Sequence, residues 1–152
     1  MTPRNIFTAG LLALACSLTC LAQDKGYWRA ASSTANSITG DITVSDTKVT
    51  IDFFAFQMVQ ARTLTPTEVA AVFDADANAG VSGKLYHVII PADRRFLKRN
   101  TLCGTEQTEW MVTFVSGGRL QVAFFSGAQA PVFTFDAVGN STDLCGTFTY
   151  SR

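Results

Sequence analysis

Apolar and polar residues alternate along much of this chain, which is the pattern of half-buried β-strands. Between residues 38 and 53, apolar side chains recur at positions 38, 42 and 44, and the turn-forming run 45–47 follows. Val49, Ile51 and Phe53 then alternate with polar residues. This stretch predicts a hairpin in which Phe53 faces inward. Ser116-Gly117-Gly118, between two further apolar runs, predicts a second hairpin with a primed turn.

About eight strands are predicted in all. They come from segments 27–31, 38–44, 48–53 running on into 54–64, 84–90, 110–115, 119–125, 132–135 and 144–150. Short strands at such spacing, with few helical segments between them, are typical of a small antiparallel barrel or a two-sheet sandwich. The sequence therefore predicts a mainly β fold of one of these two kinds, and both remain open.

One helix is marked clearly. Thr65-Pro66-Thr67-Glu68 has the form of a capping box, with Thr65 as the N-cap, Pro66 at the first helical position and Glu68 reaching back. The helix is expected to run from 66 to about 74. Residues 32–37, by contrast, are a small polar stretch that follows the first predicted strand.

The N-terminus has the three parts of a secretory signal. Arg4 precedes an uncharged run over residues 6–22, which ends in Cys20-Leu21-Ala22 with small residues where signal peptidase requires them. Residues 1–22 are therefore expected to be cleaved, leaving one mainly β domain over 23–152 in the periplasm or outside the cell. A transmembrane helix is not expected, because the run is short and contains Thr, Gly and Ser. Acylation of Cys16 in a lipobox-like run is an open alternative, although Ala13 stands where leucine is usual.

Composition limits the classes of partner. Removal of residues 1–22 leaves eleven basic and twelve acidic residues, and this balance does not suggest a nucleic-acid partner. Eleven of the twelve phenylalanines lie in the remaining 130 residues, which are enough to build a hydrophobic core.

Two cysteines, Cys103 and Cys145, lie beyond the predicted signal. A pair of cysteines in an oxidising compartment is expected to form a disulfide. Closing a loop of this length contributes about 4 kcal/mol to stability in the chain-entropy treatment. Zinc is a poor alternative, since structural zinc sites use four ligands.

Three segments resemble a recurring pattern. Residues 38–42 read ITGDI, residues 100–104 read NTLCG and residues 144–150 read LCGTFTY. In these segments the chain resembles an uncharacterised family of small exported proteobacterial proteins. The resemblance implies a periplasmic setting and supports the Cys103–Cys145 disulfide, but it carries no activity and no site residues.

The best binding candidate is a basic cluster. Arg94, Arg95, Lys98 and Arg99 place four cations within six residues, and Phe96 lies among them. Such a cluster attracts anions, and arginine beside an aromatic side chain is typical of interface hot spots. We expect residues 93–98 to form a short helical turn that presents these side chains to a protein partner or an anionic ligand.

A weak calcium motif follows the predicted helix. Asp74, Asp76 and Asn78 alternate as at the start of an EF-hand loop, but Leu85 stands where the bidentate glutamate is needed. These three residues are weak calcium candidates, and no cofactor is predicted.

Catalytic signals are few. His87 is the single histidine, and it is expected either in the core or at a barrel mouth. The sequence shows no nucleophile elbow, and nothing in the spacing of Asp41, Asp52, Glu106 and Glu109 predicts that they converge. The sequence favours a non-enzymatic binding module over an enzyme. The alternatives are a barrel that holds a small apolar ligand, an inhibitor of a host or competitor hydrolase (an analogy of architecture alone), and a hydrolase.

Overall fold

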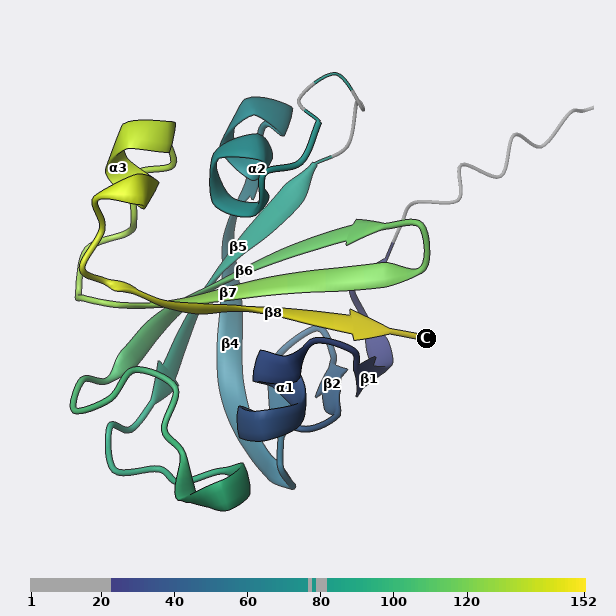
Figure 1. Ribbon diagram of the computed structural model, residues 1–152, viewed down its shortest axis with the longest axis vertical. Coiled ribbons are helices and arrows are strands. Elements are labelled where there is room, and N and C mark those ends of the chain that lie inside the picture. The colour runs from purple at the N-terminus through teal and green to yellow at the C-terminus, as the bar shows by residue number, and fades with distance from the viewer. Residues whose placement is uncertain (1–22, 77, 79–81) are drawn as a thin grey trace, which may run out of the picture.

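Eight antiparallel strands close into a barrel in the computed structural model, which describes residues 23–76, 78 and 82–152. Each strand pairs with the next one along the chain, and β8 pairs with β1 to complete the barrel (Figure 1). The strands are β1 (Gly26–Ala30), β2 (Ile42–Val44), β3 (Lys48–Ile51), β4 (Phe54–Leu64), β5 (Gly83–Ile90), β6 (Thr108–Ser116), β7 (Arg119–Ser126) and β8 (Leu144–Ser151). The predicted mainly β fold is confirmed, and it is the barrel rather than the sandwich.

Large side chains fill the inside of the barrel. Inward positions alternate with outward ones along each strand, so Tyr86, Val88 and Ile90 of β5 all face inward. An eight-stranded barrel is just wide enough for side chains to fill. The largest fully buried side chains in this inner core are Trp28, Phe124, Phe148 and Tyr150.

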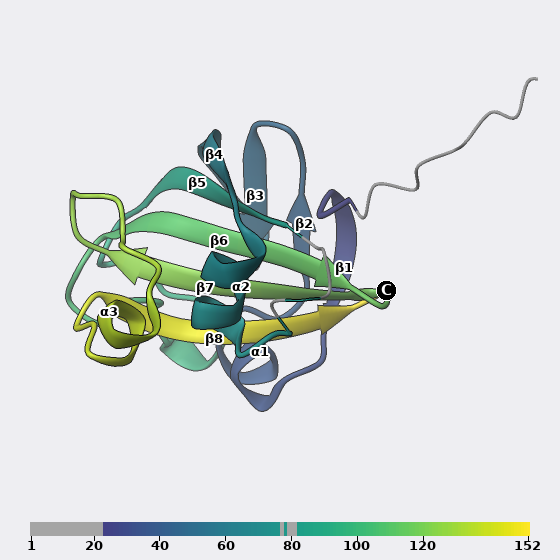
Figure 2. The same cartoon turned by 90° about the horizontal axis from the view of Figure 1, so that it is seen from above.

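A second core lies outside the barrel, beneath helix α2 (Pro66–Phe73). Val69 and Val72 of the helix pack on the outward residues Leu85, Val112 and Ala123. Figure 2, seen from above, shows α2 lying over β6 and β7. A helix can bury this outer face because these strands are apolar on both faces.

The capping box of α2 is confirmed. The Thr65 hydroxyl accepts the Glu68 amide at 3.3 Å, and the Glu68 carboxylate accepts the Thr65 amide at 2.9 Å. Arg62 donates to both oxygens of the same carboxylate, at 2.8 and 2.9 Å. The helix ends where Asp74 adopts a left-handed conformation.

The structure adds one helix and corrects two predictions. Most of the polar stretch 32–37 lies in helix α1 (Ser33–Ile38), which the Ser32 side chain caps. Residues 132–135 form no strand: Thr134 caps a short helix, α3 (Phe135–Gly139). In the basic segment the helical turn is confined to the 3-10 helix η2 (Leu97–Arg99). None of the helices in the described residues is both long and apolar enough to cross a membrane.

Residues 91–104, called the cap here, close one end of the barrel. This segment follows β5 and lies at the bottom of Figure 1 in green. Phe96 is only 5% exposed and packs edge-on against Phe56 of the inner core, with 6.0 Å between ring centroids. The predicted disulfide is present: Cys103 of the cap bonds to Cys145 of β8, with 4.9 Å between the Cα atoms. The cap is therefore held both by a buried aromatic ring and by a covalent bond.

β1 begins and β8 finishes at the opposite end of the barrel, called the termini end here, as the right side of Figure 1 shows. The turns between β2 and β3 and between β6 and β7 lie at this end, since successive strands run in opposite directions.

Candidate interaction site

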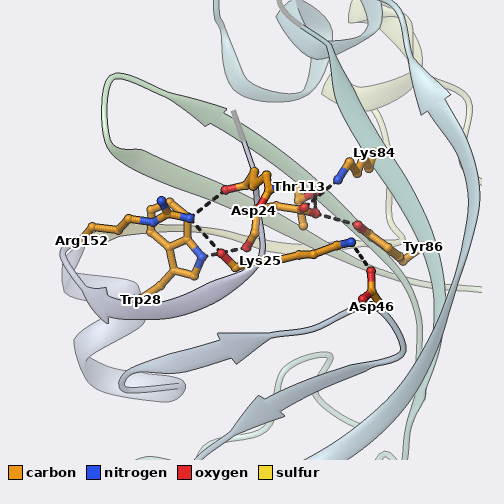
Figure 3. Close-up of polar contacts among 9 residues, drawn as sticks. Asp24, Lys25, Trp28, Asp46, Lys84, Tyr86, Thr113 and Arg152 are labelled. Atoms are coloured by element: carbon orange, nitrogen blue, oxygen red, sulfur yellow. Dashed lines mark hydrogen bonds and ion pairs between the residues drawn. The ribbon is translucent and has the colours of Figure 1, made fainter. Parts of the chain in front are cut away.

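A buried carboxylate organises the termini end. Asp24 is 2% exposed, and its oxygens accept hydrogen bonds from Lys84 Nζ at 2.7 Å, Tyr86 Oη at 2.6 Å and Thr113 Oγ1 at 2.8 Å (Figure 3). Burial raises the pKa of Asp24, but the hydrogen bonds from Lys84, Tyr86 and Thr113 outweigh it and hold the pKa below its ordinary value. Asp24 therefore stays ionised and fastens the segment just before β1 to β5 and β6.

Arg152 fastens the other terminus to the same place. Its guanidinium donates to the carbonyls of Gln23 and Lys25 at 3.0 and 2.8 Å and stacks 4.4 Å from the centroid of the Trp28 ring. The Trp28 indole donates to the Asp24 carbonyl at 2.7 Å, as Figure 3 shows. Burial and the Asp24 charge also raise the pKa of Tyr86, so the phenol stays protonated. These polar groups satisfy one another, and we assign this cluster to stability.

The cap end carries an aromatic side chain in an unusual position. Asp52 and Phe53 form the two-residue turn between β3 and β4, with φ angles of +47° and +69°. Phe53 is 97% exposed. The expectation that Phe53 faces inward is wrong, because β3 ends at Ile51 and the turn takes the next two residues. The left-handed region is a genuine outlier for a bulky residue such as phenylalanine.

Arg94 stands next to that turn. Its guanidinium carbon lies 4.2 Å from the centroid of the Phe54 ring. The Nε atom is buried and has no hydrogen-bond partner. Within the described residues, none of the ion pairs involves Arg94. The cation is therefore held in place by an aromatic ring while its charge is unmatched.

The rest of the basic cluster divides into two groups. Phe96 points from the cap into the barrel end, where it packs against Phe56, so it cannot serve as the surface contact that the sequence suggested. Arg95, Lys98 and Arg99 are exposed, as expected. Lys98 and Arg99 have φ angles of +52° and +64°, so the cap also turns through left-handed residues that are not glycine.

An open cleft of about 490 Å³ lies on the outer face of β4 and β5. Val59, Ile89, His87 and Arg94 line it. The outward row of β5 runs Leu85, His87, Ile89; Leu85 lies beneath α2, whereas Ile89 is exposed. Val59 and Ile89 lie in this cleft, and Phe53 and Phe54 lie beyond it at the β3–β4 turn, where Phe54 pairs with the buried Ile51. We call these four residues together the β4 strip. They make up four of the seven large hydrophobic side chains that are exposed in the described part of the chain.

His87 lies in this cleft, and both expectations for it are wrong: it is neither in the core nor at a barrel mouth. Its side chain is 42% exposed, with Nε2 3.5 Å from a Glu109 oxygen and the ring edge-on to Trp110 at 4.9 Å. A catalytic triad would need a serine or cysteine at this imidazole. The disulfide takes up both cysteines that the structure describes. The histidine thus contributes a polar lining group to the cleft.

The calcium candidates do not gather into a site in the described residues. Asp74 caps α2, and an Asp76 oxygen accepts the Asn78 amide at 2.8 Å. No group of three or more His, Cys, Asp or Glu side chains there is placed to hold a metal. The remaining positions of that loop, 77 and 79–81, lie outside the described residues, as do the predicted signal and Cys16.

Comparison with known proteins gives no relative. No family model matches the chain, and neither a curated protein nor a solved structure does so. The resemblance of residues 38–42, 100–104 and 144–150 to exported proteobacterial proteins stays a prediction.

Sequence reasoning found the cations of this site but missed the β4 strip. The two adjacent phenylalanines, Phe53 and Phe54, interrupt the alternation of β3, and Asp52 just before them is a turn-forming residue. That interruption was the available signal for a turn. Nothing local indicates that Val59 and Ile89 lack a covering helix, because the extent of α2 over the sheet is a tertiary property.

Proposed function

We propose that this protein is an exported, non-enzymatic binding module that recognises an acidic protein surface through the β4 strip and the cations of the cap. The observation that carries the proposal is Arg94, whose unmatched guanidinium is stacked on Phe54 beside exposed apolar side chains. Export is supported by the Cys103–Cys145 disulfide and by the signal pattern of residues 1–22.

Stacking prepares Arg94 to bind a carboxylate. A guanidinium held against an aromatic ring has lost much of its rotamer freedom before the partner arrives, so less entropy is lost on binding. It can donate two parallel hydrogen bonds to one carboxylate, which gives direction as well as energy. Arginine with neighbouring aromatic side chains is the composition of interface hot spots.

Phe53 supplies an apolar anchor. A left-handed conformation costs an L-residue roughly 1–2 kcal/mol, and this ring gains no burial within the barrel in return. Strained residues of this kind are concentrated at binding and catalytic sites, where the strain serves the function. Insertion of the ring into an apolar pocket of a partner would bury the side chain that the barrel leaves exposed.

The exposed cations of the cap favour a partner with a negatively charged surface. Arg95, Lys98 and Arg99 are exposed on the cap, and clustered charge of one sign steers an oppositely charged partner during encounter. A hydrolase with an acidic catalytic cleft is one kind of partner that fits. The apolar-ligand alternative is not favoured, since the interior positions are filled by Trp28, Phe124 and their neighbours.

The test compares matched variants of the tagged protein in its own host. Cross-linked partners are captured with the wild type, with Arg94→Glu, with Phe53→Ser and with Arg119→Glu, an exposed cation at the termini end. We expect one acidic protein whose cross-links lie on the β4 strip and whose yield falls at least tenfold in the first two variants only.

Two results contradict the proposal. One is a partner whose yield is equal in all four proteins. The other is retention by vesicles of phosphatidylglycerol with an affinity that depends on Arg95 and Lys98 but not on Phe53, because that outcome indicates a lipid surface. Melting temperatures of the variants within a few degrees of the wild type exclude misfolding as the cause.

A further inference from the structure

A groove on another flank of the barrel has the composition of a small-molecule site. It has a volume of about 340 Å³ and lies between α2 and α3, over the outer face of β7 and β8. Figures 1 and 2 show the two helices as neighbours on the same side of these strands. Phe73 of α2 and Phe135 of α3 line the groove, and Phe135 is 61% exposed.

The floor of the groove is polar. Gln121 and Thr149 are cross-strand partners, and Thr147 lies two residues along the same outward face. The Gln121 side-chain Oε1 is buried and has no hydrogen-bond partner. Such atoms are rare in folded proteins because an unmatched buried polar group is destabilising. The Gln121 amide and the two threonine hydroxyls thus lie in a row along the groove. No protein group in the described residues forms a hydrogen bond with the Gln121 oxygen.

We propose that this groove binds a neutral saccharide. An amide and two hydroxyls can exchange several hydrogen bonds with neighbouring sugar hydroxyls, because each of these groups has donor or acceptor capacity to match. The aromatic rings of Phe73 and Phe135 offer apolar surface to the C–H face of a pyranose ring. A few placed polar groups between aromatic walls are the usual composition of a ligand site.

The lining also argues against charged and purely apolar ligands. Asp74 and the C-terminal end of α2 place negative charge at this side of the groove, while Arg119 lines the adjoining hollow beyond Gln121, so the groove has no excess of positive charge that would favour an anion. An apolar ligand would bury the Gln121 amide and the two threonine hydroxyls without partners. An amine would meet a single carboxylate, Asp74, and would leave the hydroxyls of the floor unmatched.

Titration of ¹⁵N-labelled protein followed by NMR tests the proposal. The probes are cellotetraose, chitotetraose and maltotetraose, with spermidine and inorganic phosphate as charged probes. We expect at least one saccharide to shift the Gln121 side-chain amide and the backbone amides of Thr147 and Thr149 in a saturable way. Absence of such shifts with all three saccharides, or tighter binding of spermidine at the same resonances, overturns the assignment.

Two variants and one control separate binding from folding. Gln121→Leu and Phe135→Ala should each weaken saccharide binding by about tenfold, whereas Val132→Ala, an exposed site outside the groove, should not change it. Gln121→Leu should leave the melting temperature equal or higher, since it removes an unmatched buried polar group. Affinity that is unchanged in Gln121→Leu overturns the proposal. The groove and the β4 strip have no residue in common, so either proposal can fail alone.

Discussion

Two tight turns at opposite ends of the barrel have nearly the same backbone but different residues. At the termini end, β6 and β7 join through Gly117 and Gly118, with φ angles of +57° and +73°. At the cap end, β3 and β4 join through Asp52 and Phe53, with φ angles of +47° and +69°. Glycine is the residue that such primed turns favour. The turn at the termini end therefore has the residues that its backbone favours. The turn at the cap end has an exposed phenylalanine where glycine would be more stable.

The charges of the two ends differ in the same way. Asp24 and Arg152 are matched by hydrogen bonds within the protein, and together they close the termini end. Arg94 lies stacked but unmatched at the cap end, and Arg95 and Lys98 are exposed near it. Polar groups that satisfy one another contribute to the fold, whereas those left unmatched are available to a partner. The comparison leads us to place the interaction site at the cap end.

The largest effect is expected from removing the disulfide of the cap end. Replacing Cys103 and Cys145 together by serine should lower the free energy of unfolding by about 4 kcal/mol, because the loop they close is released in the unfolded chain. Urea unfolding followed by fluorescence measures this change. Equal midpoints for the variant and the oxidised wild type would show that the bond contributes nothing to the cap.

At the termini end, Asp24→Asn should destabilise the protein by about 2–3 kcal/mol, since Lys84 loses the partner of a largely buried ion pair. Asp46→Asn is the matched control. Asp46 pairs with Lys25 at the surface, where ion pairs contribute little. If both variants unfold at the same urea concentration, the Asp24 cluster does not fasten the terminus.

The contribution of the Asp24 cluster to stability should be lost in acid and unchanged near neutral pH. The pKa of Asp24 is held below its ordinary value in the folded protein, so its contribution is complete above about pH 5 and is lost as the pH falls further. Part of the loss of stability between pH 5 and pH 2 should therefore be absent in Asp24→Asn. The hydrogen bond from Tyr27 lowers the pKa of Asp41 and that from Arg62 lowers the pKa of Glu68, and these account for a remaining slope. Identical pH profiles for the two proteins would contradict the assignment.

The smallest effects are expected from exchanging glycine and phenylalanine between the two turns. Phe53→Gly should stabilise the protein by about 1 kcal/mol, because glycine adopts the left-handed conformation without strain, and partner binding should be lost. Gly118→Phe should destabilise it by about the same amount. A Cβ atom added at Gly118 meets no other heavy atom within 4 Å, so the expected cost is backbone strain rather than a clash at the Cβ. Opposite signs in thermal unfolding sharpen the comparison, and a destabilised Phe53→Gly would show that the ring stabilises the fold.

Much of the fold could be predicted from the sequence. Period-two alternation located the strands, and the capping box of Thr65 and Glu68 located α2. The candidate site was predicted only in part: the cations were found, but Phe96 proved to be a plug and Phe53 an exposed anchor. Alternation tells which residues share a face of a strand, but it does not tell which face is covered, and this is why His87 was misplaced.

The sequence by itself determined the elements whose cause is local. Strand periodicity, the helix cap and the pairing of Cys103 with Cys145 depend on residue type and spacing, or on there being one choice. Only the tertiary structure decided what lies far apart along the chain. The closure of β1 on β8, the burial of Asp24 against Lys84 and the stacking of Arg94 on Phe54 depend on strand register and barrel closure. Those long-range contacts follow from the packing of the whole barrel, and no local pattern encodes them.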